Sequence, residues 1–207
     1  MSQLRERRRR EAEQAMIAAA TELFLREGYA KTTMTAVAEL ADVAERSVYL
    51  HFDTKAKLYQ RVIEAATVGD IDSTPLPERD WSVRAMSAPT LSARIDAFAD
   101  GVSTMHERLG PLMAVNGEVE PSEPGVQESA RAARDATVVF LRSFWESADA
   151  AGLLPVGVDI PWLVDTSVIL SAAETRLVVT RHLSWGRESY RDWLVTTWWR
   201  MLAGSTT

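Results

Sequence analysis

The stretch from Glu45 to Leu58 gathers side chains that can hold a negatively charged group. Its sequence, ERSVYLHFDTKAKL, places a hydroxyl, a phenol, an imidazole and two lysines among apolar residues. Hydroxyl and phenol groups donate hydrogen bonds to phosphate oxygens, and a lysine in the first turn of a helix acts together with the free backbone N–H groups there. The stretch is therefore either a face built to hold phosphate or the solvated surface of an ordinary helix pair.

Two helices with apolar stripes precede this stretch and must brace it. The first is expected over residues 8–27 and ends at Gly28, since glycine readily adopts the left-handed conformation of a helix end. Thr33 is a good N-cap for a short second helix, because its hydroxyl can accept from a free backbone N–H group. The inward positions are expected to be Met16, Ala19, Ala20, Leu23 and Phe24 in the long helix, and Val37, Leu40 and Ala41 in the short one.

The residues ADVA form a tight turn into a second short helix, ERSVYLHF, which places Val48 and Phe52 inward. Thr54 or Asp53 is expected to cap a fourth helix, whose buried face carries Leu58, Val62, Ala65 and Ala66. Two short helices joined by such a turn and braced by a longer helix form a helix-turn-helix, whose second helix enters the major groove of DNA. The residues left exposed on that helix are Glu45, Arg46, Ser47, Tyr49 and His51.

These segments resemble the TetR family of transcriptional regulators. The resemblance is carried by LF at Leu23–Phe24, GYAKTT at Gly28–Thr33 and VAELADVAERSVYLHFDTKAKL at Val37–Leu58, which keep the spacing of the pattern LF…GY..TT…IA..AGVS..T.Y.HF..K..L. It implies a dimeric regulator with an N-terminal DNA-binding domain and a C-terminal domain for ligand binding and dimerisation. The proline-containing break VGDIDSTPLPERD places the boundary between these domains, giving residues 1–67 and 68–207.

The resemblance also implies roles for single residues. Members commonly reach bases from the position of Arg46, and they commonly hold phosphates from the positions of Thr33, Ser47, Tyr49, His51 and Lys55. Without the pattern, Tyr49 and His51 would be ordinary surface residues, and Lys57 is expected to be merely solvated.

The turn and the helix that follows it depart from the family pattern. Asp42 stands at the usual turn glycine, and aspartate tolerates the left-handed conformation better than most residues. Ala44 replaces the usual serine cap, a loss of about 1 kcal/mol that Glu45 partly offsets through the helix dipole. The carboxylates of Asp42 and Glu45 could accept from cytosine or point away from DNA.

Charge is unevenly distributed along the 207 residues. The net charge is −6, but residues 1–60 carry ten basic and nine acidic side chains. Within the first ten residues, five arginines stand against one glutamate. Pairs such as Glu6–Arg10 and Arg7–Glu11 would make this arm an extension of the first helix. The alternative is an arm that reaches phosphates or the minor groove.

Composition bounds the class of protein. Cysteine is absent, which excludes disulfides and thiolate metal sites and fits a cytoplasmic location. There is no run of 18 apolar residues and no apolar segment near the N-terminus, so we expect neither a membrane span nor a secretory signal. Helical periodicity continues to the end, predicting an all-α protein of about nine or ten helices.

The C-terminal part is expected to form a homodimer through its last two helices. The segment 160–180 is read as one helix that is apolar nearly all round, and the last helix carries Trp193, Trp198 and Trp199. A helix apolar on two faces is buried on two sides, and a second copy of the chain is the simplest second partner. The alternative is that both helices are central in a monomer.

A small, largely hydrophobic effector is expected in the C-terminal helices, because apolar pockets with a few polar groups suit such ligands. Asp165 and Glu174 could select a cationic or hydroxyl-bearing ligand, or pair with arginines such as Arg131, Arg134 or Arg176. The predicted ligand contacts are Phe98, Met105, Met113, Phe144, Trp145 and Glu174. Core filling is the alternative role of the aromatic and methionine side chains.

No enzymatic activity, metal or cofactor is expected. The chain contains no G-x-S-x-G, H-E-x-x-H, P-loop or GxGxxG motif. His106 and His182 show no metal-site spacing and are expected to be surface or capping residues. The sequence therefore predicts a DNA-binding repressor whose partners are an operator duplex, an effector and a second copy of itself. The alternative is a DNA-binding regulator without a small effector.

Overall fold

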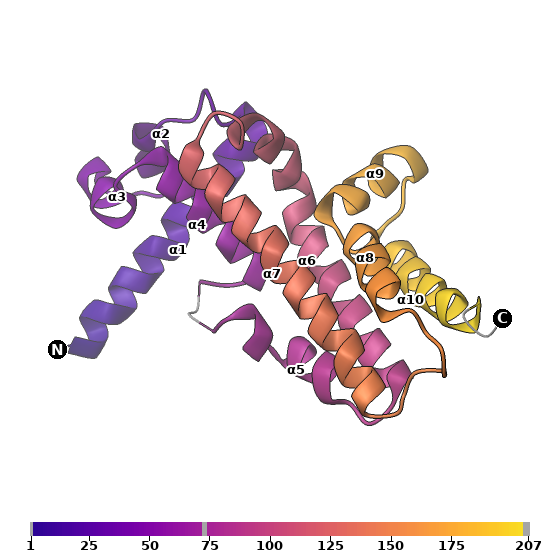
Figure 1. Cartoon of the computed structure of the whole chain (residues 1–207). Coiled ribbons are helices and arrows are strands. Elements are labelled where there is room, and N and C mark those ends of the chain that lie inside the picture. Colours follow the sequence, from indigo (N-terminus) through magenta and orange to yellow (C-terminus); the bar gives the residue numbers. More distant parts are fainter. Residues whose placement is uncertain (1, 72–73, 205–207) are drawn as a thin grey trace. The chain divides into compact units, whose positions relative to one another are not determined.

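The computed structural model describes residues 2–71 and 74–204 and is helical throughout (Figure 1). These residues form ten α-helices and one short 3-10 helix and contain no strand, which confirms the all-α prediction. In chain order they are α1 (Ser2–Glu27), α2 (Met34–Leu40), α3 (Glu45–Phe52), α4 (Lys55–Val68), η1 (Leu76–Glu78), α5 (Asp80–Ser87), α6 (Leu91–Val119), α7 (Pro124–Ala150), α8 (Ile160–Leu170), α9 (Ala173–Leu183) and α10 (Arg187–Gly204).

The chain divides into two compact units, each with its own hydrophobic core. The first unit contains α1 to α4 together with Pro111–Arg131, the end of α6 and the start of α7. The second unit contains Thr74–Gly110 and the helices from Ala132 onward. Each of the two long helices α6 and α7 therefore contributes to both cores. The assignment of DNA binding to residues 1–67 and of ligand binding to 68–207 stays a prediction.

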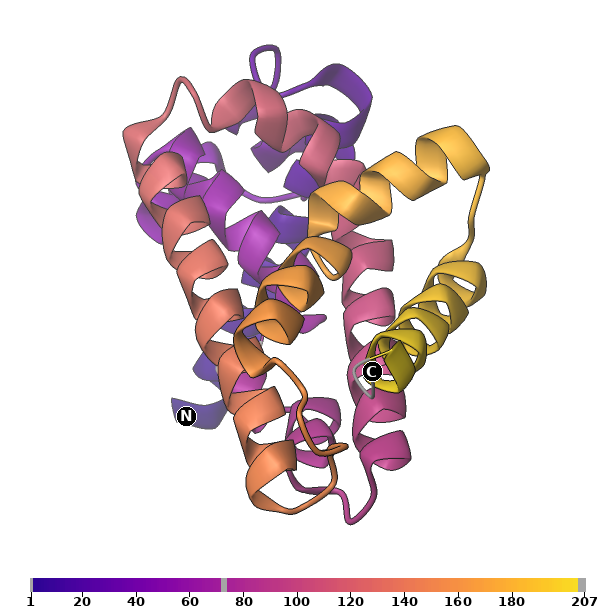
Figure 2. The same cartoon turned by 45° about the vertical axis from the view of Figure 1, so that its right-hand side comes forward.

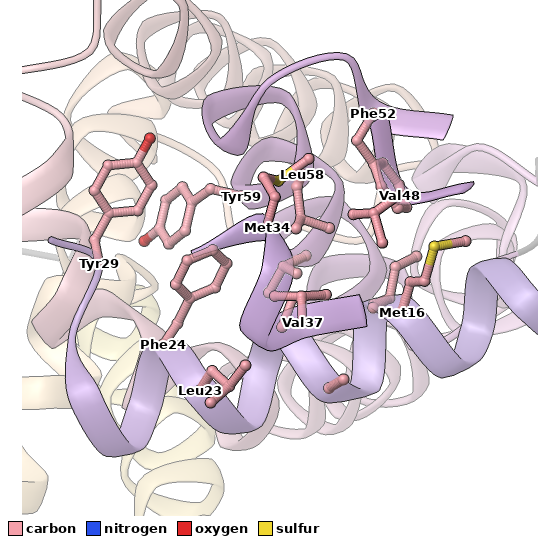
Figure 3. Packing of buried hydrophobic residues seen from close by; sticks show 14 of the residues in the cluster. Met16, Leu23, Phe24, Tyr29, Met34, Val37, Val48, Phe52, Leu58 and Tyr59 are labelled. Carbon is pink, nitrogen blue, oxygen red and sulfur yellow. The ribbon is translucent and has the colours of Figure 1, made fainter. Parts of the chain in front are cut away.

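The core of the first unit is built on the apolar stripe of α1. Met16, Ala19, Ala20, Leu23 and Phe24 are all buried, as predicted. Figure 3 shows side chains of α2, α3 and α4, among them Val37, Val48 and Leu58, pointing toward this stripe. Gly28 follows α1 with φ +81, which confirms its role in ending the helix.

Two predictions about the first unit were wrong in detail. Helix α1 begins at Ser2 rather than at residue 8, so the basic arm is helical. Leu40 is 45% exposed instead of buried, while Met34 and Ala38 pack inward beside Val37. In a helix of seven residues only one turn faces the core, and positions 34, 37 and 38 fill that face.

The second unit packs around aromatic side chains. Helix α6 buries one stripe at helical spacing, formed by Leu91, Ile95, Phe98, Val102 and Leu109. Helix α7 buries only part of its length in this core. Phe144 and Ala148 lie in the core, but Ala133 and Ala151 are exposed.

The segment 160–180 is two helices, not the single helix that we predicted. Helix α8 ends at Leu170, and α9 starts at Ala173 after Ala172 has adopted an extended conformation with ψ 145. The break releases backbone carbonyls from the helix, and side chains satisfy them. The Tyr190 hydroxyl donates to the Leu170 carbonyl at 2.9 Å, and the Thr175 hydroxyl donates to the Ile169 carbonyl. A sequence period cannot reveal a break that is stabilised by a tyrosine of a later helix.

Helix α6 continues through Pro111 and ends at Val119. Only the residues between Val119 and Pro124 connect it to α7. In the part of the chain that the structure describes, no helix has the length and apolar character needed to cross a membrane.

Candidate nucleic-acid interface

Helices α2 and α3 are joined by a tight turn that aspartate makes possible. Asp42 has φ +53, the left-handed conformation that the sequence predicted for it. The Val43 N–H donates to the Ala38 carbonyl at 3.0 Å, which closes the turn. Ala44 stands at the N-cap of α3 and provides no side-chain hydrogen bond, as expected for alanine. The local sequence thus sets the angle at which α3 leaves α2.

A carboxylate links the first turns of the two short helices. The Thr35 hydroxyl donates to Glu45 Oε1 at 3.1 Å. Glu45 therefore lies at the start of α3, and its carboxylate is bonded to α2. In this position the negative charge also interacts favourably with the positive end of the α3 dipole. Glu45 was expected either to accept from cytosine or to point away from DNA, and its bond to Thr35 gives it a structural contact instead.

Helix α3 is anchored from behind and exposed in front. Val48 is fully buried and Phe52 is 6% exposed, as predicted, and both point into the core in Figure 3. On the other side, Arg46 is exposed and Tyr49 is 48% exposed. A short helix held by two apolar anchors can present these side chains to a partner without moving its backbone.

Leu50 is the residue of this face that the sequence reading missed. It is 74% exposed, more than most large apolar side chains of the protein. The signal was present, because Leu50 follows Arg46 by four residues and so shares its helix face. In a major groove an apolar side chain at this position can contact the thymine methyl group.

Thr33 and Ser47 occupy the first turns of α2 and α3. The Thr33 hydroxyl accepts from the Ala36 N–H at 3.1 Å, which confirms the predicted cap. Thr33 is exposed and Ser47 is half-buried. Their role in phosphate binding stays a prediction.

His51 is turned inward in this structure. Its Nδ1 lies 2.8 Å from the Ser47 carbonyl. Because a carbonyl can only accept, Nδ1 carries the hydrogen of this bond. The Nε2 atom is buried and has no partner among the described residues. A phosphate contact from His51 would require the ring to rotate, which would break the bond to Ser47.

The Lys55 ammonium is held by the loop between α1 and α2. Nζ donates to the Tyr29 carbonyl at 2.8 Å and to the Thr32 carbonyl at 3.1 Å, and it lies 4.3 Å from the centre of the Tyr29 ring. Burial lowers the pKa of Lys55, and the Glu123 carboxylate acts in the opposite direction. Lys55 thus fixes the loop that leads to Thr33, whereas its predicted phosphate contact is untested.

The ends of α6 and α7 are bonded to α4 and to the same loop. The Tyr29 hydroxyl donates to Glu123 Oε1 at 2.8 Å. Gln60 Nε2 donates to the Gly125 carbonyl at 2.7 Å, and the Tyr59 hydroxyl lies 3.4 Å from Asn116 Oδ1. The positions of α4 and of the α1–α2 loop therefore depend on where α6 and α7 meet.

The basic arm is a helix whose side chains are exposed. Every residue from 5 to 11 is exposed, and Arg9 and Arg7 pair with Glu6 at 2.9 Å and Glu11 at 3.4 Å. Of the two alternatives for the arm, the structure shows the helical extension. A helical arm can still place arginines on DNA phosphates, but not as an extended chain in the minor groove.

The residues predicted to contact an effector are only partly brought together. The rings of Phe98 and Phe144 lie 5.4 Å apart, and those of Phe144 and Trp145 lie 4.8 Å apart, in the core of the second unit. Met105 is half-buried against the same core. Met113, by contrast, belongs to the first unit, and Glu174 is exposed at the start of α9.

Buried polar groups in the second unit were not foreseen. His106, predicted to be a surface or capping residue, is only 3% exposed, which corrects that prediction. It lies in the middle of α6, on the face that packs against Tyr190 of α10, at a ring distance of 6.0 Å. His182 is exposed in the last turn of α9, as predicted.

The comparison with known proteins decides what this arrangement is. Residues 16–62 match the sequence profile of the bacterial regulatory proteins of the tetR family. Residues 16–62 therefore form a regulatory segment of the tetR family type. The matched residues run from Met16 on α1 to Val62 on α4 and so contain the whole helix-turn-helix. No protein of curated function matches this chain by sequence.

Solved structures share the complete fold. This chain is similar to NalD, the secondary repressor of the MexAB-OprM multidrug efflux pump in Pseudomonas aeruginosa, with 20% identity, a TM-score of 0.71, and coverage of 94% of this chain and 96% of that one. A TetR-family regulator from Mesorhizobium loti gives 17% identity, a TM-score of 0.72 and coverage of 95% and 97%. A TetR transcription regulator from Haloarcula marismortui shares 13% sequence identity with this chain. Its TM-score is 0.68, and the match covers 94% of this chain and 97% of that one. At these identities the likeness concerns the fold.

Proposed function

We propose that the protein is a dimeric, sequence-specific transcriptional repressor that a small, largely hydrophobic effector releases from its operator. One observation carries the DNA-binding part of the proposal. Arg46, Tyr49 and Leu50 share the exposed face of a helix that Val48 and Phe52 anchor from behind. Such a helix can enter a major groove as a rigid reader. The repressor role is supported by the shared fold of NalD, which is itself described as a repressor.

Exposed apolar side chains on the C-terminal helices support the proposed homodimer. Trp162 and Ile169 on α8 are 52% and 66% exposed, and Trp199 on α10 is 40% exposed. Trp162 and Ile169 are two helical turns apart and therefore lie on one face of α8. Large exposed apolar groups of this kind mark interaction surfaces, and a second copy would cover them. The dimer then holds two copies of α3 for two half-sites, about one turn of DNA or a multiple of it apart.

Release follows from the way α6 and α7 are shared between the two cores. Their remaining parts carry Phe98 and Phe144 in the core of the second unit, while their ends contact α4 and the α1–α2 loop. An effector that binds only one arrangement of α6 and α7 would lower operator affinity through its different affinity for the two states. We place this regulator in the cytoplasm and assign it no catalytic role. A DNA-binding regulator without a small effector is the alternative.

Selection of bound duplexes from a random pool tests the proposal. The purified full-length protein is expected to enrich a pseudo-palindromic sequence, and light scattering is expected to give the mass of a dimer. A folded protein that enriches no sequence, even in dilute buffer, would contradict the DNA-binding role. A monomer at concentrations that saturate the selected duplex would contradict the dimer alone.

A further inference from the structure

Arg176 on α9 is a buried cation without a counter-ion. The residue is 7% exposed, and no acidic side chain of the described residues pairs with it. Its Nη1 donates to the Thr180 hydroxyl and, at 2.8 Å, to the Trp185 carbonyl, both of which are neutral acceptors. Burying a charge that has no counter-ion is strongly unfavourable. A charge in this position therefore indicates a partner that the chain itself does not supply.

One edge of the guanidinium is free to bind that partner. Nη1 is used within the chain, but Nε is buried and has no hydrogen-bond partner among the described residues. Nε and Nη2 together form the edge with which arginine binds a carboxylate through two parallel hydrogen bonds. The orientation of Arg176 thus leaves its carboxylate-binding edge unoccupied.

The neighbours of Arg176 are polar but uncharged. Its Cζ lies 5.5 Å from the centre of the Tyr190 ring, whose hydroxyl donates to the Leu170 carbonyl at 2.9 Å. His106 Nδ1 lies 3.5 Å from the Tyr190 hydroxyl oxygen. Burial, and then the positive charge of Arg176, lower the pKa of His106 to about 4, so the imidazole is neutral at pH 7. None of these groups carries a negative charge that would neutralise the cation.

Two indoles provide an apolar surface beside the cation. The rings of Trp185 and Trp193 lie 5.7 Å apart, and Trp193 stacks on Tyr190 at 6.0 Å. Both tryptophans are half-buried and so remain reachable. They come from the loop after α9 and from α10, which follow one another in Figure 2. An apolar ligand body could lie against the indoles while its charged group reaches Arg176.

We propose that Arg176 receives the carboxylate of an organic monoanion with an apolar body, and that Tyr190, Trp185 and Trp193 line this site. The proposal rests on the proposed function, because it names the chemical class of the effector. It differs from the class suggested by Glu174 and Asp165, since both of those carboxylates are exposed. The buried charge next to the aromatic side chains is positive, and it selects for an anion.

Ligands with the same body and different head groups test the proposal. The full-length protein is melted with octanoate, octanol or octylamine, and with naphthoate or naphthol, at pH 7. Carboxylates are expected to raise the melting temperature of the wild type and to bind roughly tenfold or more tightly than the matched alcohols. The gain should disappear in Arg176→Gln and be reduced in Arg176→Lys, which keeps the charge but loses the planar edge. Arg181→Gln is the matched control, because Arg181 is an exposed arginine of the same helix.

Three results would overturn the proposal. Carboxylates could bind no better than the alcohols, or equally well to the wild type and Arg176→Gln. Arg176→Gln could instead convert a dimer to a monomer, which would mean that the second copy satisfies the free edge. If Arg176→Gln does not fold, ligand binding to Arg176→Lys is measured instead by quenching of tryptophan fluorescence. Carboxylate binding equal to that of the wild type would then overturn the proposal. Operator binding by the ligand-free protein is measured separately, so loss of DNA binding and loss of the anion site are distinguishable.

Discussion

At the scale of single residues, two basic side chains of the helix-turn-helix have different surroundings. Arg46 is exposed on the front of α3, while the Lys55 ammonium lies against backbone carbonyls of the α1–α2 loop. An exposed guanidinium can read a base pair, whereas an ammonium held by the loop positions that loop. These environments predict different consequences of removing each charge.

Arg46→Ala is expected to cost about 1–3 kcal/mol on the selected operator and to relax specificity at one base pair. Lys55→Ala should weaken binding to all duplexes about equally and also lower the melting temperature, because the loop carbonyls lose their donor. Affinities for operator and random duplexes, measured at one salt concentration, check both. Lys57→Ala is the control, since its ion pair with Asp53 at 2.8 Å is exposed. Equal losses on operator and random duplex for Arg46→Ala would refute its assignment.

Ser167 on α8 joins two tryptophans in the second unit. Trp145 Nε1 and Trp198 Nε1 each donate to its buried hydroxyl at 3.0 Å. Ser167→Ala leaves both indole N–H groups unsatisfied and should lower the free energy of unfolding by about 2–4 kcal/mol. Ser171→Ala is the control, because that equally buried hydroxyl bonds only to the Ser167 carbonyl within its own helix stretch. Equal costs for both variants, measured by urea unfolding, would contradict this account.

At the scale of elements, two helices have features that a helical period alone does not explain: a close contact between α5 and α6, and a run of exposed charges on α1. Gly101 lies on α6 under the indole of Trp81 from α5, and a Cβ at position 101 would overlap that ring. Near the N-terminus, the first three turns of α1 carry exposed arginines. The packing of α5 on α6 thus requires that residue 101 has no side chain, whereas the start of α1 carries charged side chains that lie outside the core.

Gly101→Ala is expected to destabilise the protein by about 1–3 kcal/mol, because the indole must move to admit the methyl group. In an open helix the same change normally stabilises by about 0.5–1 kcal/mol. Gly117→Ala on the same helix is the control, since nothing lies within 4 Å of its added Cβ. A gain in melting temperature for Gly101→Ala would show that Trp81 does not pack there in solution.

Removing two arginines from the helical arm tests whether it touches DNA. Arg5→Gln with Arg8→Gln should weaken operator and random duplexes alike and reduce the salt dependence of binding by about two phosphate contacts. Arg26→Gln is a control at the far end of α1, where Arg26 pairs with Glu22 at 2.6 Å. An unchanged salt dependence in the double variant would leave the arm as a helical extension only.

At the scale of the whole molecule, stability is tied to pH through His106. Its pKa is about 4 in the folded protein, below the usual value of 6.5, because burial disfavours the charged form. As the pH falls below 6.5 the unfolded chain binds a proton that the folded chain does not. Stability is therefore lost between pH 6.5 and pH 4, and this loss ends below pH 4.

Lowering the pH from 7 to 5 is expected to cost about 2 kcal/mol through His106 alone. His106→Gln should lose correspondingly less stability over the same range, because glutamine does not titrate. Unfolding by urea at both pH values checks this difference. Identical pH dependence in the two proteins would mean that the imidazole is not buried in solution.

The sequence by itself determined the helix-turn-helix. Gly28, Thr33, Asp42 and Thr54 act through local backbone geometry, and Val48 and Phe52 through helical period, so all could be read from neighbours in the chain. The face of α3 was also predictable, although Leu50 was not named among its exposed residues. For these caps, the turn and the two anchors, the structure agrees with the local sequence pattern.

Only the tertiary structure decided the long-range contacts. The break after Leu170 depends on Tyr190, the inward turn of Lys55 depends on carbonyls more than twenty residues earlier, and the burial of His106 depends on α10. Arg176 was considered only as a partner for acidic residues, and its missing counter-ion became visible once its surroundings were known. Burial and charge pairing cannot be read from the spacing of residues in the sequence, because they depend on which distant side chains fill the volume around a group.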